Sequence, residues 1–232
     1  MKIAHEMKRC TPLILLISLL SCNLDTNKDL QIDQSFEGEE ACPTITLDYE
    51  AYSVTIDYDN PSCEDGATDR QGKLQLQYST AGNIINTTIK ITYNGYQTNN
   101  STIEGYRFFQ VKSKSSSELV LQESSDSLRL KDENASSTRL ALDFEHKGKI
   151  RNHLLTEIAT SGALEGRNWG GNPIEGIILK PKVINQTCLA QMNFYTVSGK
   201  ENWTIQRSKN SQVTHQLTYS NAEGCETTTT IN

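Results

Sequence analysis

Apolar and polar residues alternate along most of the chain after residue 42. The alternation is strictest at residues 44–49, 53–58, 73–78 and 88–93, where every second side chain is apolar and the others are Thr, Ser, Asp, Lys or Gln. Successive side chains of a β-strand point to opposite faces, so a period of two predicts strands with one buried and one solvated face.

Weaker alternation continues at residues 119–121, 128–130, 140–144, 177–179, 189–195, 203–205, 213–219 and 227–231. Only residues 153–159 have a local helical pattern. Strands with one apolar and one polar face favour antiparallel pairing over a buried parallel sheet. We therefore predict an all-β fold, built as an antiparallel sandwich or as one long curved sheet.

Turn residues separate the predicted strands at Asn60-Pro61, Asp65-Gly66, Asn94-Gly95 and Lys147-Gly148. Asn94-Gly95 is the strongest of these signals, because both residues tolerate the positive φ angles of a type I′ hairpin turn. We therefore expect a hairpin at Asn94-Gly95.

The chain begins with the pattern of a secretion signal. Basic residues within the first nine positions precede an apolar run at residues 13–20, which is too short for a bilayer that needs roughly 20 residues. The run ends in Leu19-Leu20-Ser21-Cys22, which resembles the bacterial lipoprotein signal. The resemblance implies cleavage before Cys22 and attachment of diacylglyceryl and acyl chains to that residue, which together form a stable membrane anchor.

Alternatives to this interpretation are that Cys22 is an ordinary cysteine of a secreted protein, or that the apolar run is an uncleaved anchor. Translation starts at Met1 or at Met7, because Met7-Lys8-Arg9 followed by the apolar run is the more usual form of a signal.

The sequence divides into a signal peptide at residues 1–21, a lipidated Cys22 with an acidic flexible tether up to residue 41, and a β body at residues 42–232. Without the signal, the chain has 19 Lys and Arg against 27 Asp and Glu, a formal charge of −8. Such an acidic surface disfavours nucleic acids and anionic lipid headgroups as partners.

Four cysteines, Cys42, Cys63, Cys188 and Cys225, lie in the β body. In an exported protein they predict two disulfides, with three connectivities to choose from. We favour Cys42–Cys63 and Cys188–Cys225, because each pair lies within one contiguous β segment. None of these cysteines has the C-x2-C spacing typical of a zinc site, so we expect neither a metal nor a cofactor.

Residues 55–64 and 216–226 share one order of strand, tyrosine, asparagine-containing turn, cysteine and glutamate. This similarity indicates an internal duplication, with halves at residues 42–125 and 138–232 and a boundary in the Ser-rich stretch at residues 113–137. The alternative is a chance likeness between short hairpins.

The same segments resemble a group of Bacteroidota surface lipoproteins of unassigned function. The matching motifs lie at residues 55–63, 72–78 and 103–107, at Cys188, and between residue 218 and the C-terminal Ile231-Asn232. Residues 59–62 depart from the pattern, because Asp-Asn-Pro-Ser replaces the usual glycines. The resemblance implies an all-β body, a lipid anchor and an outer-membrane address, and it implies no catalytic residue. Asp25 and Lys28-Asp29, just after Cys22, resemble the surface-export signal of that phylum and favour exposure at the cell surface over the periplasm.

No pattern of residues predicts catalysis. The histidines of the β body, His146, His153 and His215, have no G-x-S-x-G motif near them. A basic run lies between His146 and His153, which favours a solvated loop for both. A pair of carboxylates suited to glycoside hydrolysis would become recognisable only in the fold.

The acidic residues around the first turn lack the fixed spacing of a calcium-binding loop, so we interpret them as a solvated turn. They are Asp57, Asp59, Glu64, Asp65 and Asp69.

Two residues are candidates for contact or modification. Trp169 lies in a Gly-rich segment, where its ring either stacks on a sugar or a partner's apolar group, or folds down to cap the sheet edge. Asp126-Ser127-Leu128 resembles the O-glycosylation site of exported Bacteroidota proteins, which implies modification of Ser127. We expect a non-enzymatic binding or structural protein with a glycan or surface-protein partner, and the alternative is a surface hydrolase acting on glycans or peptides.

Overall fold

The computed structural model describes residues 43–59, 70–79, 84–98, 101–132, 136–190, 196–221, 225 and 227–232. The predicted signal, Cys22, the tether, the Cys42–Cys63 pair and the turns at Asn60-Pro61 and Asp65-Gly66 lie outside these residues. In the described part of the chain no helix is long and apolar enough to cross a membrane.

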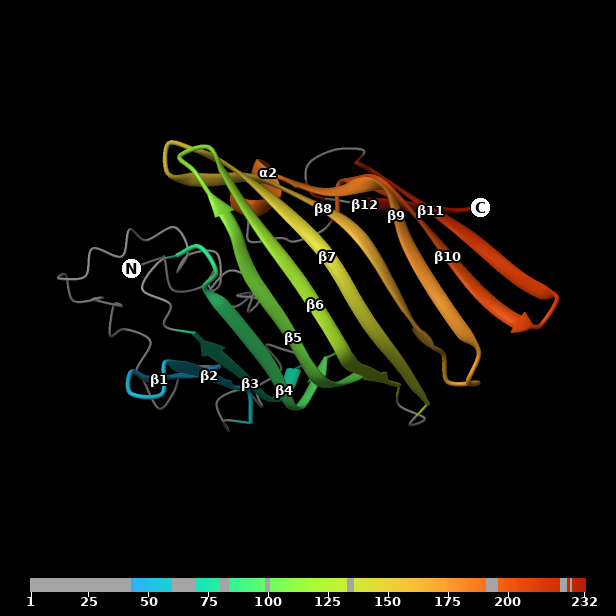
Figure 1. The fold of residues 1–232 in the computed structure, drawn as a ribbon, viewed down its shortest axis with the longest axis horizontal. Coiled ribbons are helices and arrows are strands. Elements are labelled where there is room, and N and C mark those ends of the chain that lie inside the picture. Colours follow the sequence, from blue (N-terminus) through green and yellow to red (C-terminus); the bar gives the residue numbers. More distant parts are fainter. Residues whose placement is uncertain are drawn as a thin grey trace.

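Within the described residues, twelve strands form one antiparallel sheet in which each strand pairs with its neighbours in chain order (Figure 1). In this part of the chain β1 and β12 do not pair with each other, so they are the two edges of an open sheet. The prediction of an all-β antiparallel fold is confirmed. The strands are β1 (Thr44–Asp48), β2 (Ser53–Asp57), β3 (Arg70–Tyr78), β4 (Thr88–Thr98), β5 (Ser101–Lys114), β6 (Glu118–Lys131), β7 (Ser137–Arg151), β8 (Leu154–Arg167), β9 (Pro173–Asn185), β10 (Ser198–Ser208), β11 (Ser211–Asn221) and β12 (Thr227–Ile231).

The predicted helix at residues 153–159 is wrong, because this segment is the start of β8. Asn152 and His153 have φ angles of 51° and 62°, so they form the two-residue turn between β7 and β8 that a right-handed strand twist favours. The predicted turn at Lys147-Gly148 is also wrong. Both residues lie inside β7, where a side chain on Gly148 would crowd Leu155.

The expected hairpin at Asn94-Gly95 is wrong as well, because both residues lie inside β4. β4 has one extra residue here relative to both neighbouring strands, which is a β-bulge. Gly95 has a φ of 63°, and its carbonyl oxygen would lie 2.2 Å from a Cβ on Gly72 of β3. The positive φ that the sequence indicated is therefore used to bend a strand and not to end it.

A short helix, α2 (Gln186–Ala190), takes the place of the beginning of the strand predicted at residues 189–195, and residues 191–195 lie outside the described part. The Asn185 side chain caps this helix by accepting a hydrogen bond from the Cys188 N–H at 3.0 Å.

Cys188 forms the predicted disulfide with Cys225, so this half of the disulfide prediction is confirmed. The two residues are 37 positions apart, and closing a loop of that size stabilises the fold by about 4 kcal/mol in the chain-entropy account. Both cysteines are buried together with Val197.

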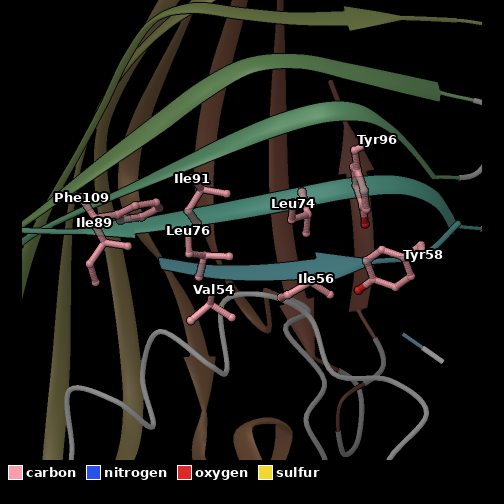
Figure 2. Close-up of a cluster of buried hydrophobic side chains, with 9 residues drawn as sticks. All are labelled: Val54, Ile56, Tyr58, Leu74, Leu76, Ile89, Ile91, Tyr96 and Phe109. Carbon is pink, nitrogen blue, oxygen red and sulfur yellow. The ribbon is translucent and has the colours of Figure 1, made fainter. Parts of the chain in front are cut away.

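One face of the sheet holds the apolar core, and we call it the inner face. On β3, buried and exposed residues alternate as the sequence predicts. Figure 2 shows the largest cluster, in which side chains from β2 to β5 and the adjoining Tyr58 gather on the inner face. Its members are Val54, Ile56, Tyr58, Leu74, Leu76, Ile89, Ile91, Tyr96 and Phe109.

A second cluster on the inner face contains Leu128, Leu140, Leu142 and Ile174. Tyr93 and Ile103 pack against both clusters, so the core is continuous from β2 to β9. The sheet also runs without a break across the Ser-rich stretch between the two predicted halves, and the duplication stays a prediction.

The bulge gives a test of the close approach between β3 and β4. Gly72 and Gly171 have nearly equal φ angles of 80° and 77°, but only Gly72 faces backbone at short range, while Gly171 has nothing within 4 Å of its Cβ position. We expect Gly171→Ala to cost about 1 kcal/mol from backbone strain, and Gly72→Ala about 3 kcal/mol because the bulge must also open.

Urea denaturation at neutral pH measures both changes. Equal losses of stability in the two variants would contradict the role given to the close contact between Gly72 and Gly95.

Candidate functional site: a polar belt on the inner face

A row of polar side chains crosses the inner face, with one residue from each of seven consecutive strands. We call this row the polar belt. Direct register pairs place His146 beside Thr160 and Thr160 beside Lys182. Its members, from β5 to β11, are Arg107, Glu123, His146, Thr160, Lys182, Glu201 and Tyr219.

Strand alternation brings these residues to the inner face, and β6 and β7 show it most directly. On β6, Glu123 follows the buried Leu119 and Leu121 at a spacing of two. On β7, His146 follows Leu140 and Leu142 at even spacing. The sequence therefore places a charged or polar side chain where the period demands an inward-facing residue.

Glu123 is the centre of the first half of the belt, and its side chain is 0% exposed. Arg107 Nε donates to Glu123 Oε1 at 2.6 Å, and His146 Nε2 lies 2.8 Å from Glu123 Oε2. His146 Nδ1 lies 2.9 Å from Thr160 Oγ1. These bonds form one chain of four groups across β5, β6, β7 and β8.

The protonation of His146 follows from its partners. An ionised carboxylate only accepts hydrogen bonds, so Nε2 must carry a proton that it donates to Glu123. In the neutral imidazole Nδ1 then accepts the hydroxyl proton of Thr160, whereas in the protonated ring Nδ1 donates to the Thr160 oxygen.

Arg107 and Glu123 stabilise each other's ionised forms. Burial would raise the pKa of Glu123, but the hydrogen bond from His146 and the charge of Arg107 outweigh it and lower this pKa from 4.5 to about 2. Burial likewise opposes the charge of Arg107, and the attraction of Glu123 raises the pKa of Arg107 above its ordinary value. Arg107 also contacts Tyr93, and its guanidinium carbon lies 5.2 Å from the centre of the Phe109 ring.

Glu201 is the centre of the second half of the belt. It accepts from Lys182 Nζ at 3.0 Å, from the Tyr219 hydroxyl at 2.5 Å, and from the side chain of Trp203. Burial would raise the pKa of Glu201, but these donors lower it below its ordinary value. Burial and the neighbouring carboxylate raise the pKa of Tyr219, so its hydroxyl keeps its proton.

The carboxylates of the belt lie deeper than its cations. The side chains of Glu123 and Glu201 are 0% and 8% exposed, whereas those of Arg107 and Lys182 are 31% and 27% exposed. The belt therefore keeps its negative charge buried and turns part of its positive charge, with hydroxyl and aromatic groups, toward the inner surface.

Apolar residues lie on both sides of the belt. On one side a hollow of about 30 Å³ borders His146, which is room for about one water. Phe109, Leu119, Leu121, Gly148, Leu155 and Ile158 form the rest of its lining. On the other side lies the cluster of Leu128, Leu140, Leu142 and Ile174.

The solvated-loop prediction for His146 is wrong, and that for His153 is confirmed. His153 lies in the exposed turn before β8, and His215 is exposed on β11. The basic residues near His146 misled the prediction, because Lys147 and Lys149 alternate with inward-facing residues along β7 and pair with Glu145 and Glu157 on the outer face. Extending the period of two from Leu140 through His146 to Ile150 would have found the correct position.

Trp169 lies in the turn between β8 and β9, and its side chain is 74% exposed, so the alternative in which it caps the sheet edge is wrong. Ser127 is exposed on β6, next to Asp126, which accepts from the Tyr106 hydroxyl. Neither residue lies on the belt. The modification of Ser127 stays a prediction.

Of the acidic residues around the first turn, the structure describes Asp57 and Asp59, and each is paired with another group. Asp57 pairs with Lys73 at 2.7 Å, which lowers the pKa of Asp57, and Asp59 accepts from the Gly72 N–H at 2.7 Å. Glu64, Asp65 and Asp69 lie outside the described residues. Within the described part of the chain, no group of His, Cys, Asp or Glu has the arrangement needed to hold a metal ion.

Comparison with known proteins gave no match of this chain to a protein family, to a curated protein or to a solved structure.

The paired state of Glu123 predicts a dependence of stability on pH. Its pKa is lowered on folding, so its stabilising contribution is complete above about pH 4.5 and is lost as the pH falls from 4.5 toward about 2. Glu123→Gln leaves Arg107 without its anion, and we expect a loss of about 3 kcal/mol at pH 7. The difference in unfolding free energy between this variant and the wild type should be smaller at pH 3 than at pH 7.

Glu118→Gln is the matched control, because Glu118 is exposed on the same strand. Unfolding free energies of all three proteins at pH 7 and pH 3 provide the measurement. A constant gap between wild type and Glu123→Gln across this range would show that Glu123 is not ionised and paired as described.

Proposed function

We propose that this chain is a lipid-anchored, exported binding protein of the outer membrane that holds its ligand on the inner face and catalyses no reaction. The polar belt is the observation that carries the binding role. The anchor is supported by the signal pattern that ends at Cys22 and by the likeness to surface lipoproteins. Growth of cells with labelled palmitate tests the anchor. We expect the wild-type protein to incorporate the label and Cys22→Ala to lose it.

The belt supports binding because a folded sheet has no general need for buried charge. Taking two charges out of water costs several kcal/mol each, and apolar residues of similar volume often stabilise a core equally well or better. Here seven consecutive strands each supply a polar group to one row. A row of fixed donors and rings between apolar borders is the usual composition of a ligand site.

A surface hydrolase is the second candidate, and the chain from Glu123 through His146 to Thr160 favours it. An acid, a histidine and a hydroxyl in hydrogen-bond contact are the parts of a nucleophilic triad. Here, however, the acid is bonded to Nε2 and the hydroxyl to Nδ1, which is the reverse of the serine-protease arrangement. The polar row also continues for three strands beyond Thr160, which a triad does not require.

Glycoside hydrolysis by the two buried carboxylates is disfavoured on electrostatic grounds. The general acid of such an enzyme needs a raised pKa, so that it holds a proton near neutral pH. Both Glu123 and Glu201 have lowered pKa values, because donors and cations surround them.

A screen across ligand classes tests the binding role. The chain without its signal is examined by native mass spectrometry against neutral oligosaccharides, short peptides and acyl lipids. We expect at least one class to bind. Its affinity for Lys182→Met should be at least about tenfold lower, because one of the two partly exposed cations of the belt is then lost. Trp169→Ala is the control, because Trp169 lies away from the belt and should leave this binding unchanged.

Two results would oppose the proposal. If Trp169→Ala loses binding and Lys182→Met keeps it, the binding site does not lie on the inner face. Release of a cleaved product by the wild type, abolished in Thr160→Val, would favour the hydrolase.

A further inference from the structure

The second half of the belt differs from the first in how its groups are held. Three donors from three adjacent strands, Lys182 on β9, Trp203 on β10 and Tyr219 on β11, converge on one carboxylate. We call these residues with Glu201 the Glu201 cluster. Glu201 is only 6% exposed, so it orients the other three and offers little surface of its own.

Side chains on the inner face are more exposed to solvent around the Glu201 cluster than in the N-terminal core. In the N-terminal core, Leu74 and Leu76 are 0% exposed. Near the Glu201 cluster, by contrast, Trp203 and Tyr219 are half-buried, and His215, the register partner of Trp203, is exposed. Two aromatic rings, an ammonium group and an imidazole are thus partly accessible within one small area.

We propose that the Glu201 cluster is a carbohydrate-binding site that takes an uncharged sugar ring of a surface glycan. This inference rests on the proposed binding function and names its ligand class. The faces of Trp and Tyr rings are suited to the apolar C–H face of a sugar, and both side chains lose little conformational entropy on binding because they are already held.

The polar groups of the cluster complement the rings. A Lys ammonium has three donors, of which Lys182 gives one to Glu201, so donors remain for the hydroxyl groups of a sugar. Lys182 Nζ lies 5.9 Å from the Tyr219 ring centre, close enough for one ring-sized ligand to meet both. The formal charge of −8 on the chain without its signal disfavours polyanionic glycans and therefore favours a neutral one.

Fluorescence of Trp203 provides a direct test. The chain has two Trp residues, so Trp169→Phe leaves Trp203 as the single emitter. This protein is titrated with neutral hexasaccharides of glucose, mannose and xylose, and with a hexauronate. We expect a saturable change of emission with at least one neutral sugar, and about tenfold weaker binding after Tyr219→Phe or Lys182→Met. Trp203→Phe, which keeps Trp169, should show no saturable change.

Circular dichroism and urea midpoints establish that each variant is folded before its affinity is compared. The carbohydrate site would be overturned by no response to any neutral sugar or by a response confined to the hexauronate. It would also be overturned if the Tyr219→Phe and Lys182→Met variants bound the sugar as tightly as the parent Trp169→Phe protein. The ligand screen separates this failure from failure of the proposed function, because peptide or lipid binding that depends on Lys182 would leave the binding role intact.

Discussion

The buried charge of Glu123 constrains how the strands in the middle of the sheet pair with one another. Its carboxylate has no contact with water, so Arg107 on β5 and His146 on β7 must stay beside it. A slip of one residue in either pairing would turn one of these side chains to the outer face and leave the carboxylate without a partner. The ion pair thus adds to the constraint that the apolar core already places on the register of β5, β6 and β7, because a slip would also leave a buried charge without a partner.

The order of the strands in the sheet allows such a row of interactions to form. Because every strand pairs with its neighbours in chain order, inward-facing residues at matching heights form a continuous line across the sheet. Glycine-containing bulges allow the strands to bend while this line is kept. At Gly162, with a φ of 126°, a Cβ would lie 2.2 Å from the Asp143 carbonyl oxygen, so β7 and β8 approach closely just beside Thr160. The strands that bend the sheet are therefore also strands that carry the polar belt.

Much of the fold could be predicted from the sequence, because the period of two is a local property. The strands around Leu74, Ile89 and Leu217 are found where the alternation indicated. The turns were harder, since Asn94-Gly95 suits a bulge as well as a hairpin and only the pairing partners decide between them. Asn152-His153 was missed because histidine is a weak turn signal, although both residues adopt positive φ.

The candidate site could not be predicted in the same way. Arg107, Glu123 and His146 lie far apart in the sequence, and their meeting depends on register across three strands. His146 was predicted to lie in a loop because of its basic neighbours Lys147 and Lys149, which lie on the outer face of the same strand. Trp169 has a sequence signal because it lies in a glycine-rich turn, whereas Trp203 has none because it lies in an ordinary strand, where the buried Glu201 holds it.

The central claim is that the polar belt serves binding and adds no net stability to the fold, although it constrains the pairing of the strands that carry it. Replacing Arg107, Glu123 and His146 together by Met, Leu and Phe removes the charges as a set, so no buried ion is left without a partner. The unfolding free energy of this triple variant at pH 7 tests the claim most directly. The account predicts a stability equal to or higher than that of the wild type, and a loss of several kcal/mol would contradict it by showing that the belt holds the sheet together.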